Sequence, residues 1–259
     1  MRVTVVRSSA VRVAAFARRR WLALVGGLAV TVVVAVVALY AAAGFFDRDP
    51  VHLFGLDGKK QPVAVVYFSG DMGLRFGMGP FVAGALAARG VPVVGLASST
   101  AFRSHRTHAQ VGAIVAATLR DALARTGADR LVVIGQSFGA DMARVGLPML
   151  PEDLRRRIAA VELVVPGETA YFRADPSGIA YTGTPDAGPD GARALTWLPL
   201  TCIRGAEEPD SLCPLLTMPN VRRVVMPGDH FLNHDHDTLT RRIMADLRPF
   251  VPALQENDR

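Results

Sequence analysis

A serine flanked by glycines is the clearest chemical signal in this sequence. Ser137 lies in the pentapeptide Gly135-Gln136-Ser137-Phe138-Gly139, after the apolar run 131–134 and before a segment with helical spacing. A G-x-S-x-G pattern between a strand and a helix is typical of a nucleophile elbow, a turn tight enough to expose the serine. We therefore predict that Ser137 is a nucleophile. The alternative is an ordinary strand-to-helix turn with a capping serine.

A nucleophilic serine requires a general base and an acid that orients the base. On a sheet of this kind the three residues follow in the order serine, acid, histidine, each after a strand. The predicted base is His230, which follows the predicted strand 221–228. The predicted acid is Asp210, on the loop after the run 199–205, with Glu208 as the alternative because both residues fall on that loop.

Acyl transfer also requires hydrogen-bond donors for the developing oxyanion. The backbone N–H of Phe138, directly after the serine, is one expected donor. The loop 69–73 follows the first long apolar run and contains two glycines that let a substrate approach the backbone. We expect the second donor to be the backbone N–H of Asp71 or Met72.

The histidines near the C-terminus offer a competing chemistry. His230, His234 and His236 are interleaved with aspartates, and such ligands at short spacing suit zinc, which would supply a metal-bound water. The cluster lacks the helical H-E-x-x-H pattern and leaves Ser137 unexplained. We therefore expect no metal or other cofactor.

The elements that must position these residues alternate between strand and helix. Continuous apolar runs at 62–70, 91–97 and 131–135 indicate strands covered on both faces, and the segments 158–167, 199–205 and 221–228 are three further candidate strands. Helical spacing occurs at 79–89, 111–125 and 238–250. This alternation predicts a mostly parallel, doubly wound α/β sheet, and the elbow narrows it to the α/β-hydrolase fold. The Gly-, Pro- and Asp-rich segment 168–198 is expected to be an irregular insertion over the active edge.

The N-terminus predicts a membrane anchor. Residues 21–46 contain no charged side chain, and this length suffices to cross a bilayer. Residues 1–20 contain six arginines and no acid, so the positive-inside bias places the N-terminus in the cytoplasm and the rest outside. A cleaved signal peptide is the alternative, because Ala41-Ala42-Ala43 resembles a cleavage site.

The predicted organisation is thus a basic cytoplasmic stub (1–20), a transmembrane signal anchor (21–46), a linker (47–61) and a hydrolase domain (62–259). A short first hairpin is the alternative for the linker segment. The whole chain has 29 basic and 23 acidic residues, so without the six N-terminal arginines the two signs balance at 23 each. A basic nucleic-acid-binding face is therefore not supported. Cys202 and Cys213 flank the acid loop, and in an oxidising compartment we expect them to form a disulfide that braces it.

Several motifs together make the sequence similar to the VirJ/AcvB family of bacterial virulence-associated α/β hydrolases. The similarity extends from about residue 62 to 248. The chain differs from the family pattern at Gln136, Phe231 and His108. It keeps Ser137, Asp210 and His230. The matching strings are 67–71 with Gly73, 135–141, 202–205, 210–214 and 227–230.

The resemblance implies a periplasmic enzyme at the bacterial inner membrane. For the AcvB members of the family, the resemblance implies hydrolysis of lysyl-phosphatidylglycerol, an aminoacyl ester on a membrane lipid. Because a lysyl ester carries ammonium groups, we expect carboxylates in its pocket, with Asp71, Asp141 and Glu168 as candidates. For the VirJ side the resemblance implies a role in the export of virulence substrates, in which the fold is a binding module for secretion-system or exported protein partners. A serine esterase acting on another acyl ester is the third possibility.

Overall fold

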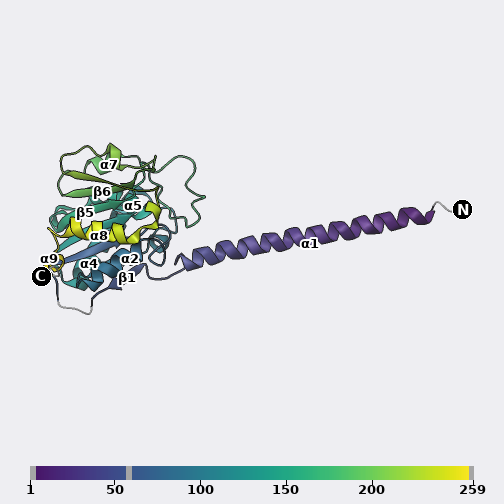
Figure 1. Ribbon diagram of the computed structural model, residues 1–259, viewed down its shortest axis with the longest axis horizontal. Coiled ribbons are helices and arrows are strands. Elements are labelled where there is room, and N and C mark those ends of the chain that lie inside the picture. The colour runs from purple at the N-terminus through teal and green to yellow at the C-terminus, as the bar shows by residue number, and fades with distance from the viewer. Residues whose placement is uncertain (1–3, 57–59, 257–259) are drawn as a thin grey trace.

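A seven-stranded, mostly parallel sheet forms the centre of the domain in the computed structural model, which describes residues 4–56 and 60–256 (Figure 1). The strand order is β1-β3-β2-β4-β5-β6-β7, and only β1 runs antiparallel to its neighbour. The strands are β1 (Val51–Phe54), β2 (Val63–Phe68), β3 (Val93–Leu96), β4 (Arg130–Gln136), β5 (Ile158–Val164), β6 (Leu200–Gly205) and β7 (Val221–Met226).

Helices cover both faces of this sheet, and each face has its own hydrophobic core. Residues of α4 and α5 pack into one core, and residues of α2 and α8 into the other. Strands β2, β3 and β5 are buried along their whole length, as expected for a parallel sheet between two helical layers. The helices are α1 (Thr4–Ala42), α2 (Gly79–Ala88), α3 (Ser98–Ala101), α4 (His108–Thr126), α5 (Phe138–Gly146), α6 (Glu152–Arg155), α7 (Asp190–Arg193), α8 (His236–Leu247) and α9 (Ala253–Glu256).

The predicted α/β-hydrolase architecture is confirmed, and so is the apolar N-terminal helix. Helix α1 projects from the domain as one long rod (Figure 1). Within the described residues its segment Arg18–Ala42 is long and apolar enough to cross a membrane, by length and composition. The helix ends at Ala42, four residues before the predicted end of the anchor. Ala43 and Gly44 are already buried in the domain.

The segment 47–61 is not simply a linker. Residues 51–54 form the edge strand β1, which pairs with β3, and the N–H of Ala97 donates to the carbonyl of Pro50 at 2.7 Å. The folded domain therefore begins well before the predicted boundary at residue 62. Residues 1–3 of the basic stub, 57–59 of the expected linker and 257–259 of the hydrolase domain lie outside the described residues.

Candidate active site

Ser137 occupies a sharp turn between β4 and α5. Its backbone has φ 51° and ψ −123°, a conformation that few non-glycine residues adopt. The flanking residues must be glycines because any side chain there would clash with the backbone. A Cβ at Gly139 would lie 2.2 Å from the carbonyl oxygen of Phe68, and one at Gly135 would lie 2.6 Å from Cα of Ala140. The Ser137 side chain makes no capping hydrogen bond to α5, so the capping interpretation does not describe this serine.

The serine hydroxyl faces a histidine that a carboxylate holds in place. Oγ of Ser137 lies 2.8 Å from Nε2 of His230, and Nδ1 of the same ring lies 2.6 Å from Oε1 of Glu208. His230 follows β7 and Glu208 follows β6, as the chain order of such triads requires. This geometry permits proton transfer from the serine to the imidazole and stabilises the imidazolium that results.

The predicted acid Asp210 is not the partner of the histidine. Its side chain is exposed, and its carbonyl oxygen accepts a hydrogen bond from the N–H of Glu168. The side chain of Glu208, by contrast, is only 7% exposed, and its Oε2 accepts from the N–H of Gly205 at 3.3 Å. The loop therefore turns Glu208, and not Asp210, towards His230, so the alternative acid takes the position assigned to Asp210.

The expected disulfide braces this loop. Cys202 in β6 is bonded to Cys213, at the start of a short 3₁₀ helix (Cys213–Leu215), and both residues are buried. The loop that carries Glu208 is thereby closed at both ends by a covalent bond. A closed loop has fewer conformations to lose on folding, which favours a fixed position for the carboxylate.

The charge state of His230 reflects opposing influences. Burial lowers its pKa, whereas the hydrogen bond and charge of Glu208 and the charges of Asp141 and Asp71 raise it. The balance places the pKa of His230 above its ordinary value. An imidazole with a raised pKa is a stronger base towards the serine hydroxyl.

Backbone donors lie on both sides of the serine. Among the hydrogen bonds of the described residues, none uses the N–H of Phe138 or of Asp71, so both remain open to an oxyanion. The N–H of Met72 donates instead to the carboxylate of Asp71. Asp71 is therefore the better second donor of the two predicted residues.

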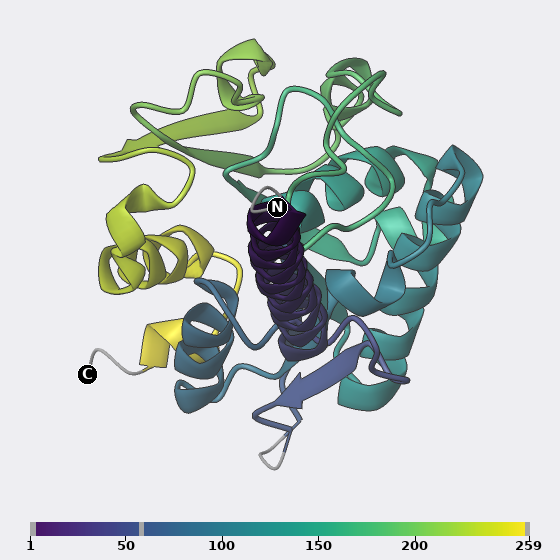
Figure 2. The same ribbon diagram turned by 90° about the vertical axis from the view of Figure 1, so that its right-hand side faces the viewer.

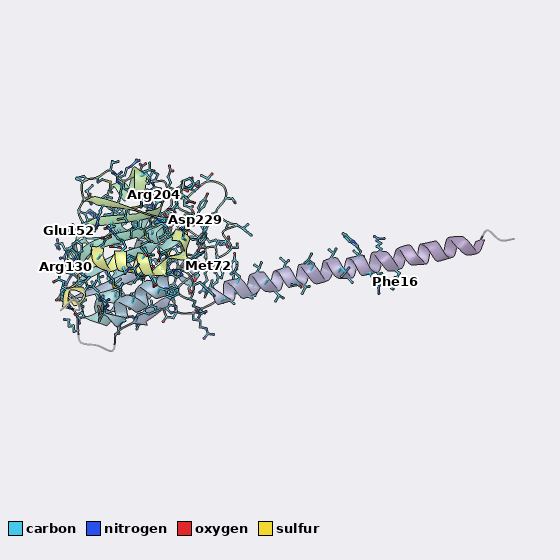
Figure 3. The ribbon with its side chains drawn as sticks, in the orientation of Figure 1. Phe16, Met72, Arg130, Glu152, Arg204 and Asp229 are labelled. Atoms are coloured by element: carbon cyan, nitrogen blue, oxygen red, sulfur yellow. A yellow bond between two sulfur atoms is a disulfide. The ribbon has the colours of Figure 1, made fainter. Side chains whose placement is uncertain are left out.

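A large pocket opens at the serine, with a cavity volume of about 850 Å³. It lies at the carboxyl edge of the sheet, on the side from which α1 leaves. Figure 3 shows Met72 and Asp229 on that side and Arg130 and Glu152 on the opposite side. The lining includes the triad serine and histidine, the carboxylates Asp71, Asp141 and Asp210, and the aromatic residues Phe76, Phe81, Phe138, Tyr171, Tyr181 and Phe231.

Two of the three carboxylates predicted to bind substrate line this pocket. Asp71 accepts a hydrogen bond from the hydroxyl of Tyr181 at 2.9 Å, and burial raises its pKa. Burial raises the pKa of Asp141 to about 6, against the opposing effect of Arg144. Glu168 does not contribute its side chain, which is exposed and outside the lining.

Asp141 also holds the insertion 168–198 in place. Its Oδ1 accepts from Nε of Arg144 at 3.0 Å and from the N–H of Gly167 at 3.1 Å. Arg144 is completely buried and donates to the carbonyls of Gly188 (2.7 Å) and Glu168 (3.2 Å). The carboxylate therefore has a structural role beside its position in the pocket.

Sequence reasoning missed Tyr181 and Arg144. Tyr181 lies in the irregular insertion, where no periodicity marks a side chain as inward, and its ring stacks on Phe138 with centroids 6.4 Å apart. Arg144 reads as an exposed helix residue because arginine is rarely buried. The only available signal was its spacing of three from Asp141, which places the two on one face of α5.

The metal alternative finds no support in the arrangement of side chains. Among the described residues, no three His, Cys, Asp or Glu side chains gather closely enough to hold a metal ion. His236 instead stacks on Phe81, and His234 stacks on Phe231.

The sheet order and the serine elbow define the α/β-hydrolase class, and solved structures agree. The chain is similar to Est1E from Butyrivibrio proteoclasticus, with 17% identity, a TM-score of 0.55 and coverage of 74% of this chain and 89% of that one. An α/β serine hydrolase homologue from Coxiella burnetii gives 17% identity, a TM-score of 0.54 and coverage of 76% and 90%. The thioesterase domain from the curacin biosynthetic pathway gives 16% identity, a TM-score of 0.55 and coverage of 75% of this chain and 94% of that one. At these identities the likeness shows the fold alone.

A protein-family model assigns the chain to one family within this class. The model described as bacterial virulence protein (VirJ) matches residues 62–250, and the chain belongs to this family. None of the curated proteins matches the sequence. The resemblance inferred from the motifs is therefore confirmed at the level of the family.

Proposed function

We propose that this protein is a membrane-anchored serine ester hydrolase. The observation that carries the proposal is the continuous contact from Ser137 through His230 to Glu208, at 2.8 Å and 2.6 Å. In the reaction, Oγ of Ser137 attacks the acyl carbonyl while Nε2 of His230 accepts the hydroxyl proton. The N–H groups of Phe138 and Asp71 donate to the oxyanion.

The same residues complete the turnover. His230 returns the proton to the leaving alcohol, and the acyl group stays on Ser137. A water molecule then attacks the acyl-enzyme, with His230 again accepting the proton, and the free acid leaves. Glu208 keeps the imidazole in one orientation through both steps.

For the substrate we propose the aminoacyl ester of lysyl-phosphatidylglycerol. The pocket supports this choice by its charge: Asp71, Asp141 and Asp210 line it, whereas its lining arginine, Arg75, is already paired with Asp47 at 2.7 Å. Carboxylates suit the ammonium groups of a lysyl ester. Its cavity volume of about 850 Å³ is also large enough for a headgroup with its glycerol.

We further propose that the domain lies in the periplasm and α1 in the bacterial inner membrane, with the N-terminus in the cytoplasm. The Cys202–Cys213 disulfide supports an oxidising compartment, and the arginines before the apolar helix support this orientation.

The Ser137→Ala variant tests the reaction. The purified full chain, reconstituted in vesicles that contain lysyl-phosphatidylglycerol, is expected to release lysine, and the variant is expected to lose at least about 10³-fold in rate while remaining folded. Full activity in the variant would exclude Ser137 as the nucleophile. If the wild type hydrolyses no ester, the alternative of a binding module for secretion partners gains support.

The substrate class has a separate test. Asp71→Asn and Asp141→Asn are expected to lower hydrolysis of a lysyl ester by about tenfold or more, and that of a neutral acetyl ester much less, because only the first carries ammonium groups. Glu168→Gln is the matched control, since that side chain lies outside the pocket. Equal losses on both esters would leave the hydrolase and remove the aminoacyl substrate.

A further inference from the structure

Most of the large exposed apolar side chains of the domain lie near the mouth of the pocket. Five large ones lie at the carboxyl edge of the sheet, and we call them the apolar rim. Phe76, Phe81 and Phe231 line the pocket, while Phe46 and Ile179 lie outside its lining. The exposed fractions are 58% for Phe46, 44% for Phe76, 55% for Phe81, 77% for Ile179 and 57% for Phe231. Such a cluster on a soluble surface marks an interaction site.

The end of α1 is fixed at this same edge. The carbonyl of Ala43 accepts from the hydroxyl of Ser99 at 2.5 Å, and the carbonyl of Gly44 accepts from the hydroxyl of Thr100 at 2.7 Å. A Cβ at Gly73 would lie 2.6 Å from the carbonyl oxygen of Ala43, so the loop after β2 packs directly against the helix end.

The insertion is fastened to α1 as well. The hydroxyl of Tyr40 donates to the carboxylate of Asp175, which also accepts from the N–H of Ala180 at 2.6 Å. The N–H of Asp175 donates to the hydroxyl of Tyr181 at 3.0 Å, and that hydroxyl donates to Asp71 beside the serine. A chain of polar contacts thus connects the membrane helix to the active site.

These contacts leave no flexible spacer between the apolar helix and the domain. The span ends at Ala42, and Ala43 is already 1% exposed in the core. Figure 2 looks along α1 onto the domain, and the helix emerges from the middle of the face that carries the loops at the carboxyl edge. When α1 spans a bilayer, this face must lie against the membrane surface.

We propose that the apolar rim inserts into the lipid leaflet next to the domain, so that the pocket opens directly to membrane lipids. The bilayer is the occupant because α1 leaves from the same face and brings it there. Aromatic side chains favour this interfacial depth. The rim is also held in position: the ring of Phe81 stacks on His236 with centroids 4.3 Å apart, and that of Phe231 stacks on His234 at 5.6 Å. The role in substrate loading rests on the proposed function, whereas the membrane contact does not.

Depth-dependent fluorescence quenching tests the contact. The full chain is placed in vesicles with brominated lipids after Trp21 and Trp197 have been replaced by Phe, and a single tryptophan is introduced at Phe46 or Ile179. We expect brominated lipids to quench both probes. A tryptophan at Glu152, on the opposite side of the domain, is the control and is expected to be unquenched (Figure 3). Probes at positions 46 and 179 that are as insensitive as the control would overturn the proposal.

The rates on a lipid ester and on a water-soluble ester distinguish a role of the rim in substrate loading from a role in catalysis. The double variant Phe46→Gln/Ile179→Gln is expected to lower hydrolysis of lipid ester in vesicles by about tenfold while a water-soluble ester is hydrolysed at the wild-type rate. Leu53→Gln removes another exposed apolar side chain (45%), on the edge strand β1 and outside the pocket lining, and is expected to change neither rate.

The outcomes of these tests are distinguishable. An unchanged lipid rate in the double variant would overturn the loading role even if Ser137→Ala is inactive. Quenching without any lipid hydrolysis would keep the membrane contact and remove the proposed lipid substrate. Equal losses on both esters would show a general defect and contradict the rim's role.

Discussion

Glu208 and Asp210 lie two residues apart on one loop and differ in burial: Glu208 is buried, whereas Asp210 is exposed. The glycine-flanked pattern after β4 was sufficient to predict Ser137, and the chain order was sufficient to predict His230 after β7. It could not choose the acid, because both carboxylates follow the same strand and the choice depends on which side chain the loop turns inward. The 7% exposure of the Glu208 side chain and its contact with His230 are tertiary facts that no local pattern encodes.

Substitution of the two acids distinguishes their roles. Glu208→Gln is expected to lower kcat/KM for an acetyl ester by roughly 10³–10⁴-fold, because an amide cannot stabilise the imidazolium. Asp210→Asn is expected to retain most activity on this neutral ester. Glu207→Gln, an exposed neighbour on the same loop, is the control. A larger loss for Asp210→Asn than for Glu208→Gln would contradict the geometry.

The pH profile reports the charge of the base. His230 must be neutral to accept a proton, and its pKa is raised, so the acidic limb of kcat/KM is expected to have its midpoint above the ordinary value of about 6.5. Glu208→Gln removes the largest raising influence, and the midpoint is expected to move to lower pH. Initial rates with a water-soluble ester across the pH range measure both. A wild-type midpoint below the ordinary value would be inconsistent with this site.

At the scale of elements, β5 carries an unusual residue beneath α8. Glu162 is 1% exposed, and its Oε2 has no hydrogen-bond partner among the described residues. Burial raises its pKa well above the usual value, as does the nearby charge of Asp246, while Arg242 and Arg222 oppose the shift. Asp246 is itself paired with these two arginines at 3.0 Å and 2.6 Å. Glu162 is therefore expected to be protonated in the folded protein at neutral pH.

Replacement by glutamine is expected to stabilise the fold at neutral pH. In the unfolded chain Glu162 ionises near its ordinary pKa of about 4.3, whereas the folded state keeps the proton, so stability falls as pH rises between the two values. Glu162→Gln removes this loss and is expected to raise stability by on the order of 1 kcal/mol, or about 2–4 °C in Tm, at pH 8. The gain should shrink towards pH 4. Thermal unfolding at both pH values measures it, and a gain independent of pH would contradict the assignment.

Buried strands and long helices were predictable because their apolar periodicity is strong. The runs that became β2, β3 and β4 read as strands from their continuous apolar residues, and the run that became β5 is apolar apart from Glu162. Strand β1 was missed because a four-residue edge strand, Val51–Phe54, contains a histidine and has no continuous apolar pattern. Its existence depends on pairing with β3, which lies about forty residues further along the chain, and such long-range pairing is invisible in a local segment.

At the scale of the whole molecule, the position of the domain relative to the membrane depends on α1. A reporter fused after Arg259 is expected to be active only if it is of the periplasmic type, and the chain is expected to resist carbonate extraction from membranes. N-terminal sequencing should find the intact start. A mature start at Gly44 would show cleavage, and it would leave the new terminal ammonium at a buried position.

Because the end of α1 is fixed to the domain, the bilayer that α1 is proposed to span would determine the orientation of the domain. The charge-free residues 21–42 of this helix extend about 33 Å, more than the roughly 30 Å of a typical hydrocarbon core, so the helix is expected to tilt. Because Ala43 and Gly44 hold the domain to the helix, the domain must tilt with it, and lipid chain length sets the angle at which the pocket meets the leaflet. Hydrolysis of vesicle lipid should therefore vary with bilayer thickness, while hydrolysis of a water-soluble ester should not. Bilayer thickness would then change the rate of the proposed lipid hydrolysis without any ligand or modification.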